Sequence, residues 1–340
     1  PLNKPVYILA IESSCDDTSA SILKDKTVLS NLIANQEVHE KYGGVVPELA
    51  SRAHQSNILP VVKAALSDAN VKLEDLNAIA YTKGPGLLGS LLVGSSFAKG
   101  LAWSLGIPLI EVNHMQAHIL AHLIEQDNEP IPPFPFICLT VSGGHTQLVL
   151  VKSSAHFEII GQTLDDAVGE AFDKIAKLLG LPYPGGPMID KYAREGNPDA
   201  FTFSKSKVGE FEFSFSGIKT SVLYFLQKEI KKNPEFINKN LKDLCASVQK
   251  HLVSVLIDKL KLAEKKYQTK HIAIAGGVSA NSLLRSSLTK LEEELDVKSY
   301  CPNFEYCTDN AAMIGIVGYY GFLNKQFAPL TSTPKARLAL

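Results

Sequence analysis

Residues 136–151 read FICLTVSGGHTQLVLV, which is an apolar run, a small polar turn at 142–146 and a second apolar run. Short runs rich in Val, Ile and Leu that are bounded by Gly and Ser are typical of buried strands. The same order recurs at 6–24, where VYILAIE is followed by the polar SSCDDT and then by SASILK. A unit that occurs once in each half of a chain predicts internal duplication, here of a βββαβα-like domain.

Strands and helices alternate between the two copies. Apolar runs at 76–82 and 107–113 are typical of strands, and the residues that follow each run, 87–106 and 114–125, have the composition of helices. This alternation predicts a mixed α/β sheet with both faces covered.

The Pro-rich, polar stretch EQDNEPIPPFPF at 125–136 is typical of a linker. A chain of 340 residues also exceeds what one hydrophobic core usually fills. We therefore expect a first domain over 1–130, completed by the C-terminal helix at about 309–340, and a second domain over 131–308 with inserted helices.

Composition narrows the class of protein. The chain is 45% hydrophobic and 20% charged with a net charge of −1, so no overall basic field indicates nucleic acid. Its five cysteines form no CxxC motif, which argues against a disulfide framework or a Cys-rich zinc site and favours a reducing, cytoplasmic setting. The N-terminal apolar run is too short for a signal peptide, and no run approaches the ~18 residues of a membrane span.

The two polar turns are candidate phosphate sites, because tight turns of Gly, Ser and Thr direct backbone N–H groups toward one point. In SGGHT, Gly143 and Gly144 allow close approach of a ligand to the backbone. In SSCDDT, Asp16 follows Glu12 of the preceding strand, and carboxylates beside a phosphate indicate a bound cation or a charge-positioning role. Each turn alone is also consistent with a plain hairpin; together they favour a nucleotide.

Two further stretches fit a nucleotide site. In AGGVSANSLLR at 275–285 a strand ends in two glycines, and Asn281 could hydrogen-bond a base or ribose. Asp173 lies on an expected helix that leads to a Gly/Pro-rich loop with Gly186 and Asp190, and carboxylates commonly hold ribose hydroxyls. The alternatives are a plain strand-to-helix turn and solvated surface carboxylates.

His114 and His118 are four residues apart in NHMQAH, so on a helix both rings lie on one face and could hold one ion. Zinc proteases of the HEXXH type need Glu after the first His, but Met115 stands there. A third ligand is still required. Asp309 in CTDNAAMIG is a candidate, and its alternative role is to cap the last helix.

Together these pieces resemble the TsaD family, also called Gcp and once described as O-sialoglycoprotein endopeptidase, in its bacterial form. The matching stretches are IESSCDDTSAS, GGVVPELASRAH, KGPGLLGSLLVG, NHMQAH, VSGGHTQL, DDAVGEAFDKIAKLLGLPYPGGP, FSFSGIKT, AGGVSAN and CTDNAAMIG, in order along nearly the whole chain. The departures are Met-Gln-Ala between the histidines, where many members have Glu-Gly, and Ser13 where Thr is common.

The resemblance implies an α/β, actin-like ATPase (ASKHA) fold of two duplicated RNase H-like domains with a nucleotide cleft between them. It also implies an activity, the transfer of a threonylcarbamoyl group from threonylcarbamoyl-AMP to N6 of adenosine 37, just 3′ of the anticodon, in tRNAs that read ANN codons. AMP is released.

The resemblance further assigns residues and partners. One divalent metal, Fe²⁺ or Zn²⁺, is implied on His114, His118 and Asp309. The implied positions for the adenine nucleotide (threonylcarbamoyl-AMP, ATP or AMP) are Thr140, Val141, Ser142, Gly143, Gly144, Asp173, Gly186, Asp190 and Asn281. Apart from the resemblance, the two carboxylates of the acidic turn suggest the hypothesis that Asp16 or Glu12 accepts the amine proton. The implied partners are tRNA, a TsaB-like paralogue and a TsaE-like ATPase. No association with a membrane is expected.

Three alternatives stay open. A small-molecule kinase of the same fold would need a catalytic Asp and a sugar pocket, and it leaves the histidine pair unexplained. A metalloprotease lacks its Glu. A non-catalytic scaffold would be expected to have lost the three metal-binding residues, which are all present.

Overall fold

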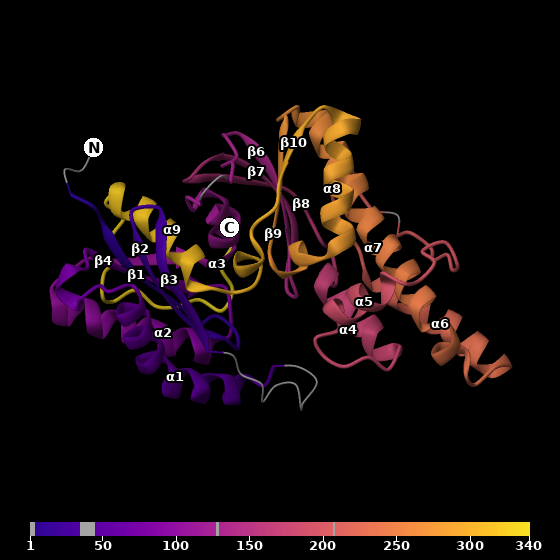
Figure 1. Ribbon diagram of the computed structural model, residues 1–340, viewed down its shortest axis with the longest axis horizontal. Helices are drawn as coiled ribbons and strands as arrows, with labels where there is room; N and C mark the ends of the chain where they lie inside the picture. Colours follow the sequence, from indigo (N-terminus) through magenta and orange to yellow (C-terminus); the bar gives the residue numbers. More distant parts are fainter. Residues whose placement is uncertain (1–3, 35–44, 127–128, 207) are drawn as a thin grey trace. The chain divides into compact units, whose positions relative to one another are not determined.

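The computed structural model describes residues 4–34, 45–126, 129–206 and 208–340 (Figure 1). The chain forms two compact units. Unit 1 comprises Pro1–Ile131 together with Pro302–Leu340, and unit 2 comprises Pro132–Cys301. The expected domain ranges, with boundaries at 130/131 and 308/309, stay a prediction.

Unit 1 is built on a five-stranded sheet in the order β3-β2-β1-β4-β5. Its strands are β1 (Tyr7–Glu12), β2 (Thr18–Lys24), β3 (Thr27–Ala34), β4 (Ala78–Gly84) and β5 (Leu109–Asn113). Strand β1 pairs antiparallel with β2, with Glu12 opposite Ser19, and parallel with β4. The predicted hairpin around SSCDDT is therefore confirmed.

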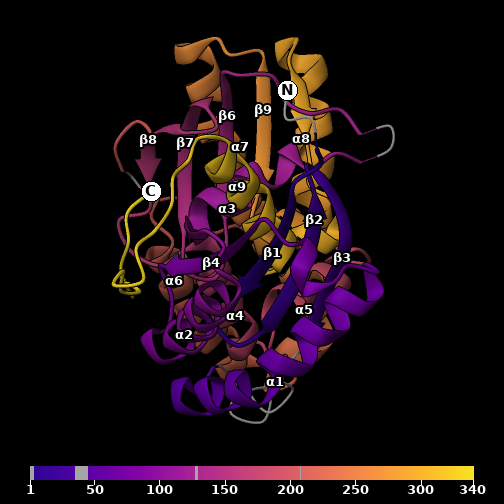
Figure 2. The same ribbon diagram turned by 90° about the vertical axis from the view of Figure 1, so that its left-hand side faces the viewer.

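Helices cover both faces of this sheet (Figures 1 and 2). They are α1 (Pro47–Asp68), α2 (Leu88–Leu105), α3 (His114–Leu120) and α9 (Ala311–Leu323), with short 3₁₀ turns at Leu73–Asp75, Ala121–Leu123 and Phe304–Tyr306. Leu9 and Ile11 point into a core shared with α1 and α2. Ile8 points the other way, toward Gly318 of α9, as the two-residue period of a strand requires.

Unit 2 repeats the arrangement with a five-stranded sheet in the order β10-β9-β6-β7-β8. The strands are β6 (Phe136–Val141), β7 (Thr146–Ser153), β8 (His156–Gln162), β9 (His271–Ala275) and β10 (Lys298–Tyr300). Strand β6 pairs antiparallel with β7, with Val141 opposite Thr146, and parallel with β9. Both units thus place their first strand between an antiparallel and a parallel neighbour, which confirms the predicted duplication.

The helices of unit 2 are α4 (Val168–Leu178), α5 (Gly185–Ala193), α6 (Ser216–Lys232), α7 (Phe236–Tyr267) and α8 (Ser282–Leu295), with a 3₁₀ turn at Gly277–Ala280. All five contribute side chains to one core together with Leu139 and Val141 of the sheet. The expected helices at 217–232 and 241–267 are present within α6 and α7.

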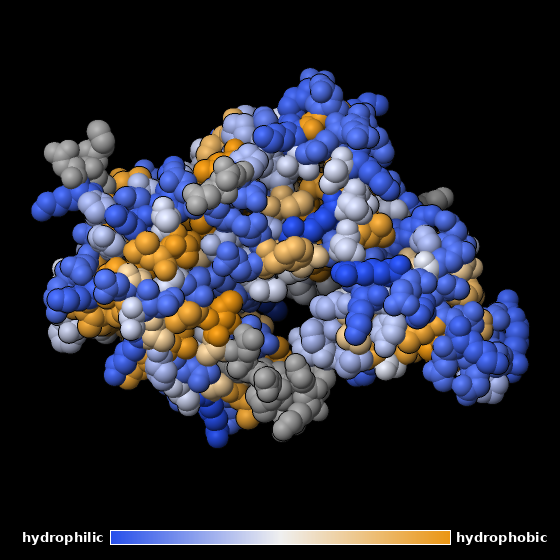
Figure 3. Space-filling view, viewed as in Figure 1, coloured by the Kyte–Doolittle hydropathy of each residue, from blue (hydrophilic) through white to orange (hydrophobic). Residues whose placement is uncertain are grey.

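The surface of unit 2 is hydrophilic over the outer end of α6 and the start of α7 (Figure 3). Lysines there include Lys231, Lys232 and Lys239, all exposed. Lys232 forms an ion pair with Glu229 at 2.7 Å. Neighbouring acids therefore offset part of this basic stretch. None of the helices in the described part of the chain has both the length and the apolar character that a membrane span needs.

Candidate functional site

The histidine pair lies where β5 runs into α3. Asn113 ends the strand and caps the helix, because its Oδ1 accepts hydrogen bonds from the amides of Met115 at 2.9 Å and Gln116 at 3.3 Å. The helix therefore begins at His114 and places His118 one turn further along the same face. Both rings are buried, with exposed fractions of 9% and 2%.

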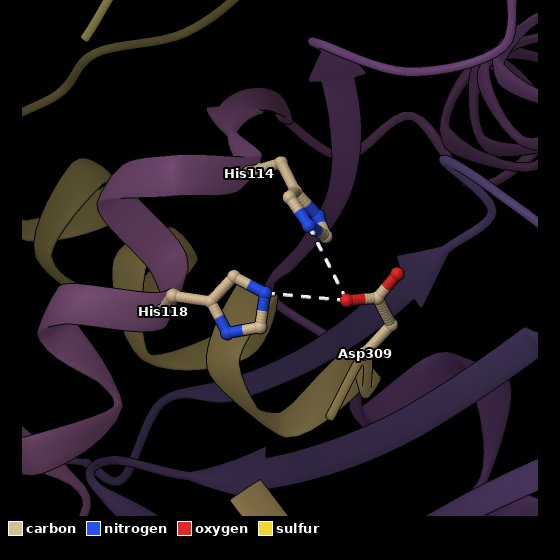
Figure 4. Close-up of side chains that lie close together, drawn as sticks. All are labelled: His114, His118 and Asp309. Carbon is tan, nitrogen blue, oxygen red and sulfur yellow. Dashed lines mark hydrogen bonds and ion pairs between the residues drawn. The ribbon is translucent and has the colours of Figure 1, made fainter. Parts of the chain in front are cut away.

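Asp309 comes to these rings from the segment before α9 (Figure 4). Its Oδ1 lies 3.4 Å from Nε2 of His114 and 3.2 Å from Nε2 of His118. The start of α9 is fixed from the sheet, since the amide of Ala311 donates to Ser19 Oγ at 2.9 Å. Asp309, 191 positions after His118, therefore meets the histidine pair within unit 1.

Asp309 does not cap α9, which was its alternative predicted role. Asn310 is the N-cap of α9, and its side chain accepts from the amide of Met313 at 3.0 Å. The carboxylate of Asp309 is therefore turned toward the histidines. Met115, in the place where HEXXH enzymes carry their Glu, is buried and supplies no base.

This arrangement fits a divalent metal. Ligand atoms of a tetrahedral ion with bonds near 2.05 Å stand roughly 3.3 Å apart, and the two distances to Asp309 Oδ1 are 3.4 and 3.2 Å. Among the described residues, His114, His118 and Asp309 are the group whose ligand atoms all lie within 4.8 Å of one another. Two imidazoles and one carboxylate are a common ligand set for zinc and iron.

The electrostatics of the site favour positive charge. Burial by itself lowers the pKa of His114, but the charges of Asp309 and Glu12 outweigh burial and hold that pKa well above its usual range. Burial also disfavours the charged form of Asp309 and so raises its pKa. The charge of His114 and the hydrogen bonds from both rings outweigh burial and lower the pKa of Asp309 overall. For His118 burial prevails and lowers the pKa, so this ring is neutral and its lone pair suits a metal.

Glu12 stands behind His114 and has no exposed surface. Its Oε2 lies 3.1 Å from Nδ1 of His114 and accepts a hydrogen bond from Thr82 Oγ1 at 2.6 Å. Its Oε1 accepts from the amide of Ser14 at 2.5 Å. This enclosed carboxylate is poorly arranged to take a proton from an incoming substrate.

The acidic turn after β1 is tied down by His54 of α1. The two ring nitrogens of His54 lie 2.7 Å from Thr18 Oγ1 and 3.1 Å from the carbonyl oxygen of Cys15. Asp16 lies between these two anchors and is partly exposed. Of the two predicted proton acceptors, Asp16 is therefore the one that solvent and ligands can reach.

The SGGHT turn of unit 2 is organised by the side chain of Ser142. Its Oγ accepts hydrogen bonds from the amides of Gly144 at 3.3 Å and His145 at 3.0 Å. A Cβ on Gly143 or Gly144 would have no atom within 4 Å, so the turn is open on that side. The expected approach of a ligand is sterically possible, but two of the expected amide donors already bond to Ser142 in this structure.

The neighbouring positions Thr140 and Val141 are wholly buried in β6. Val141 instead supports the second glycine turn, because a Cβ on Gly276 would lie 2.5 Å from the Val141 carbonyl oxygen. Gly276 also has a φ of 88°, which favours glycine. The 142–146 and 275–277 turns therefore lie against each other within unit 2.

Asp173 and Gly186 are brought together. Asp173 Oδ1 accepts hydrogen bonds from the amides of Gly185 at 2.8 Å and Gly186 at 3.2 Å. Burial raises the pKa of Asp173, and the two amides offset only part of this. The Gly/Pro-rich loop is thus fixed to α4 by the carboxylate that the sequence analysis singled out.

Asp190 and Asn281 are engaged within the protein. Asp190 Oδ1 accepts from the amide of Ser282 at 3.2 Å and from its hydroxyl at 2.6 Å. Asn281 caps α8 by accepting from the amide of Leu284 at 3.0 Å, and its Nδ2 donates to Gln249 at 3.0 Å. These contacts hold α5, α7 and α8 together. A ligand could bond to Asp190 or Asn281 only through donor or acceptor positions that these hydrogen bonds leave unused.

Polar residues outside the predicted set support these sites. Thr82 bonds Glu12, His54 anchors the acidic turn, and Ser282 bonds Asp190. Each lies more than 30 positions from its partner. No spacing rule links residues that far apart, so a single sequence carries no signal for them.

Comparison with known proteins adds a family. Residues 27–316 match TsaD, described as tRNA N6-adenosine threonylcarbamoyltransferase. Relatives with that description include one from Christiangramia forsetii, 61% identical over 335 residues that cover 98% of this chain and 98% of the relative. Another, from Porphyromonas gingivalis, is 53% identical over 341 residues that cover 100% of each chain.

Solved structures of more distant proteins share the fold. Component A of (R)-2-hydroxyglutaryl-CoA dehydratase from Acidaminococcus fermentans matches with a TM-score of 0.53 at 17% identity, over 93% of this chain and 98% of that one. HypF from T. kodakarensis matches with a TM-score of 0.61 at 14% identity, over 96% of this chain and 49% of that one. At such identities the likeness concerns the fold alone, and the predicted α/β, actin-like ATPase fold is confirmed.

Proposed function

The chain belongs to the TsaD family of tRNA N6-adenosine threonylcarbamoyltransferases, and on this premise we propose the reaction that its sites carry out. The threonylcarbamoyl group of threonylcarbamoyl-AMP is transferred to N6 of adenosine 37 in tRNAs that read ANN codons. The observation that carries the proposal is the meeting of His114, His118 and Asp309 in a chain whose relatives bear this activity.

The reaction is an acyl transfer. A bond forms between N6 of the adenosine and the carbamoyl carbon, and the bond from that carbon to the phosphate oxygen breaks. AMP leaves with the electron pair, and N6 loses one proton. The exocyclic amine is a weak nucleophile because its lone pair is delocalised into the purine, so the carbonyl group needs activation and the leaving phosphate needs stabilisation.

The two histidines and Asp309 would hold the metal, Fe²⁺ or Zn²⁺. A bound divalent ion supplies Lewis-acid polarisation of the carbamoyl or phosphate oxygen. The protein's own contribution is to hold one carboxylate oxygen 3.4 and 3.2 Å from two histidine Nε2 atoms in a buried place. Asp16, partly exposed in the acidic turn, would accept the proton of N6.

Unit 2 would bind the adenine nucleotide. The turn at 142–146 offers an open glycine face to the phosphate, with the Ser142 hydroxyl beside it. Asp173 Oδ1 is occupied by two amides, so its other oxygen would accept from a ribose hydroxyl. Gly186 permits close approach, since a Cβ there would have only Phe172 Cβ near it, at 3.8 Å.

The partners belong to the same proposal. tRNA is the acceptor substrate named in the family's description. A TsaB-like paralogue and a TsaE-like ATPase would complete the active assembly, and a separate enzyme would supply the adenylate. The setting would be the cytoplasm, where these tRNAs are found.

The test combines a metal measurement with a product measurement. The chain is purified, and its metal content is determined by plasma mass spectrometry. It is then incubated with its partners, the adenylate-forming enzyme, threonine, bicarbonate, ATP and tRNA. Nucleoside mass spectrometry of the tRNA should show threonylcarbamoyladenosine. ADP formed in proportion to an added sugar, without the modified nucleoside, would instead support a small-molecule kinase, and peptide cleavage would support a protease.

Two substitutions sharpen this test. His114→Ala should lose bound metal and tRNA modification together. His122→Ala, just beyond the same helix, serves as the matched control and should retain both. Full modification by a metal-free His114→Ala variant would contradict the proposed role of the metal.

A further inference from the structure

The proposed reaction leaves one buried carboxylate without a task. Glu12 has no exposed surface, although transfer of an ionised carboxylate from water into a protein interior is strongly unfavourable. A carboxylate in such a place is expected to serve the groups that it contacts.

The contacts of Glu12 determine its orientation. Thr82 Oγ1 donates to Oε2 at 2.6 Å from the neighbouring strand β4, and the Ser14 amide donates to Oε1 at 2.5 Å from the turn. Each carboxylate oxygen is thereby held by a separate donor. Oε2 also lies 3.1 Å from Nδ1 of His114, closer than the Ser14 hydroxyl at 3.3 Å. Only the protonated form of this ring nitrogen can donate to a carboxylate.

The consequence concerns the other ring nitrogen. In a neutral imidazole one nitrogen carries the hydrogen and the other carries the lone pair. With the hydrogen of His114 on Nδ1 and directed to Glu12, the lone pair lies on Nε2, which faces Asp309 at 3.4 Å. Carboxylates that accept from a ligating histidine in this way fix its tautomer and ring orientation and increase its basicity.

The second histidine differs. Nδ1 of His118 is buried, and among the described residues no hydrogen-bond partner meets it. The two nitrogen ligands are therefore unequal, since Nδ1 of His114 faces a carboxylate and Nδ1 of His118 faces no hydrogen-bond partner among the described residues. A defect in the Glu12 contact should accordingly be felt through His114.

We propose that Glu12 is a positioning residue that holds His114 in the metal-binding tautomer, with Thr82 and Ser14 holding Glu12 in turn. The inference rests on the metal site of the proposed function, but not on the transfer reaction. Its test therefore needs only the full chain and a metal, Zn²⁺ or its spectroscopic substitute Co²⁺.

The main variant is Glu12→Gln, which keeps the shape of the side chain and removes its charge. Its Zn²⁺ dissociation constant, measured by competition with a chromophoric chelator, should be about 10- to 100-fold weaker than that of the wild type. Nitrogen-15 NMR of labelled histidine in the Zn²⁺-loaded wild type should show both ligating rings with the hydrogen on Nδ1 and the metal on Nε2. The Nδ1–H of one ring should show the shift of a hydrogen bond to a carboxylate, which Glu12→Gln weakens. The Co²⁺ absorption spectrum of the variant should change in intensity.

Two further variants provide controls. Thr82→Val removes the donor to Oε2 and should weaken Zn²⁺ binding by less than Glu12→Gln does. Glu111→Gln changes a half-buried carboxylate of the same sheet whose partners are Lys83, at 2.6 Å, and the Ser332 hydroxyl, and it should bind Zn²⁺ like the wild type. A merely structural role for Glu12 would lower the melting temperature of the metal-free protein and leave the affinity of the folded fraction unchanged.

The outcomes separate the two proposals. Equal Zn²⁺ affinity of wild type, Glu12→Gln and Thr82→Val would overturn the positioning role and leave the metal site intact. Failure of the wild type itself to bind Zn²⁺, Co²⁺ or Fe²⁺ would overturn both. Should Glu12→Gln fail to fold, the Thr82→Val affinity and the histidine NMR of the wild type decide the question.

Discussion

Asp173 Oδ1 lies 2.8 Å from the amide nitrogen of Gly185, and this bond joins the middle of α4 to the first residue of α5. The contact is close on the backbone side as well, since a Cβ on Gly185 would lie 3.1 Å from Asp173 Cα and 2.3 Å from Ala176 Cβ. The hydrogen bond and the close packing together fix the start of α5 against α4. The carboxylate that fixes it is also the proposed ribose acceptor.

Asp173→Asn should separate stability from binding. Burial raises the pKa of Asp173 above its ordinary 3.8, so folding disfavours the charged form. The stability that belongs to the neutral acid is present below the unfolded pKa and is lost as the pH rises through the folded pKa. Asparagine keeps an acceptor for Gly185 and carries no charge. Urea unfolding at pH 7 should find the variant at least as stable as the wild type, whereas calorimetry should find weaker AMP binding.

The pH series provides the control for this prediction. At a pH below 3.8 the wild-type side chain is neutral as well, so any stability advantage of Asp173→Asn should shrink there. A variant that is much less stable than the wild type at pH 7 would show that the amide contacts outweigh burial. Unchanged AMP affinity would argue against the ribose role of Asp173.

Gly185→Ala and Gly186→Ala should differ sharply, although the glycines are adjacent. A methyl group at 185 would overlap Ala176, and overpacking of this kind costs about 1–3 kcal/mol. A methyl group at 186 would meet only Phe172 Cβ, at an ordinary 3.8 Å. Thermal unfolding should show a clear loss for the first variant and little change for the second. If Gly186 borders the nucleotide, its variant should nevertheless bind AMP more weakly.

Much of this fold could be predicted because it rests on local pattern. The two-residue alternation of VYILAIE and FICLTV, and the small polar turn after each, require no knowledge of tertiary contacts. The site is less local. The spacing of His114 and His118 predicts a shared helix face, but the local sequence around Asp309 favours a helix cap, and only the resemblance implies this residue as the third ligand.

Two details that the sequence leaves open share a physical cause, which is competition for the same polar atom. The sequence cannot tell that Asn310, one residue on, caps α9 and leaves Asp309 to face the histidines. Nor can it tell that Ser142 Oγ takes the amide hydrogens of Gly144 and His145. Which partner a donor finds depends on distances set by the whole unit, and neighbouring residues of similar chemistry compete for them.

Asp165→Asn should destabilise unit 2 in a pH-dependent way. Asp165 accepts from the hydroxyls of Ser214 and Ser216 at 2.6 and 2.7 Å and from the amide of Phe215 at 2.7 Å, which fixes the start of α6. Partial burial raises the pKa of Asp165, but these hydrogen bonds outweigh it and lower the pKa below 3.8. The resulting stability is present above the unfolded pKa and is lost as the pH falls through the folded pKa.

The variant should therefore unfold at a lower urea concentration than the wild type at pH 7. Its free energy of unfolding should be lower by only about 1 kcal/mol, because the group is largely solvated. The difference from wild type should narrow as the pH falls below 3.8. Asp199→Asn is a suitable comparison, because it removes an exposed ion pair with Lys250 and should have little effect at either pH. If Asp165→Asn remains less stable than the wild type at low pH, the lost stability would come from the altered hydrogen-bond geometry of the side chain and not from its missing charge.

Substitutions of Asn113 can distinguish two kinds of support for the metal site, the local cap of α3 and a long-range bond to the C-terminal segment. Its Oδ1 caps α3 through the amides of Met115 and Gln116, while its Nδ2 donates to the carbonyl oxygen of Ala339 at 2.7 Å. Asn113→Ala removes both contacts, and loss of an N-cap alone costs about 0.5–2 kcal/mol. Asn113→Asp keeps the cap and removes only the tie to the chain near Ala339.

Because the cap sets where α3 begins, it also sets the direction of the His114 ring. We expect Asn113→Ala to lower both the melting temperature and the Zn²⁺ affinity, and Asn113→Asp to bind Zn²⁺ at least as well as the wild type, since the added charge favours a cation. Equal losses of Zn²⁺ affinity in both variants would instead assign the support of His114 to the segment around Ala339. Competition titration with Zn²⁺ and thermal unfolding of the metal-free proteins distinguish these results.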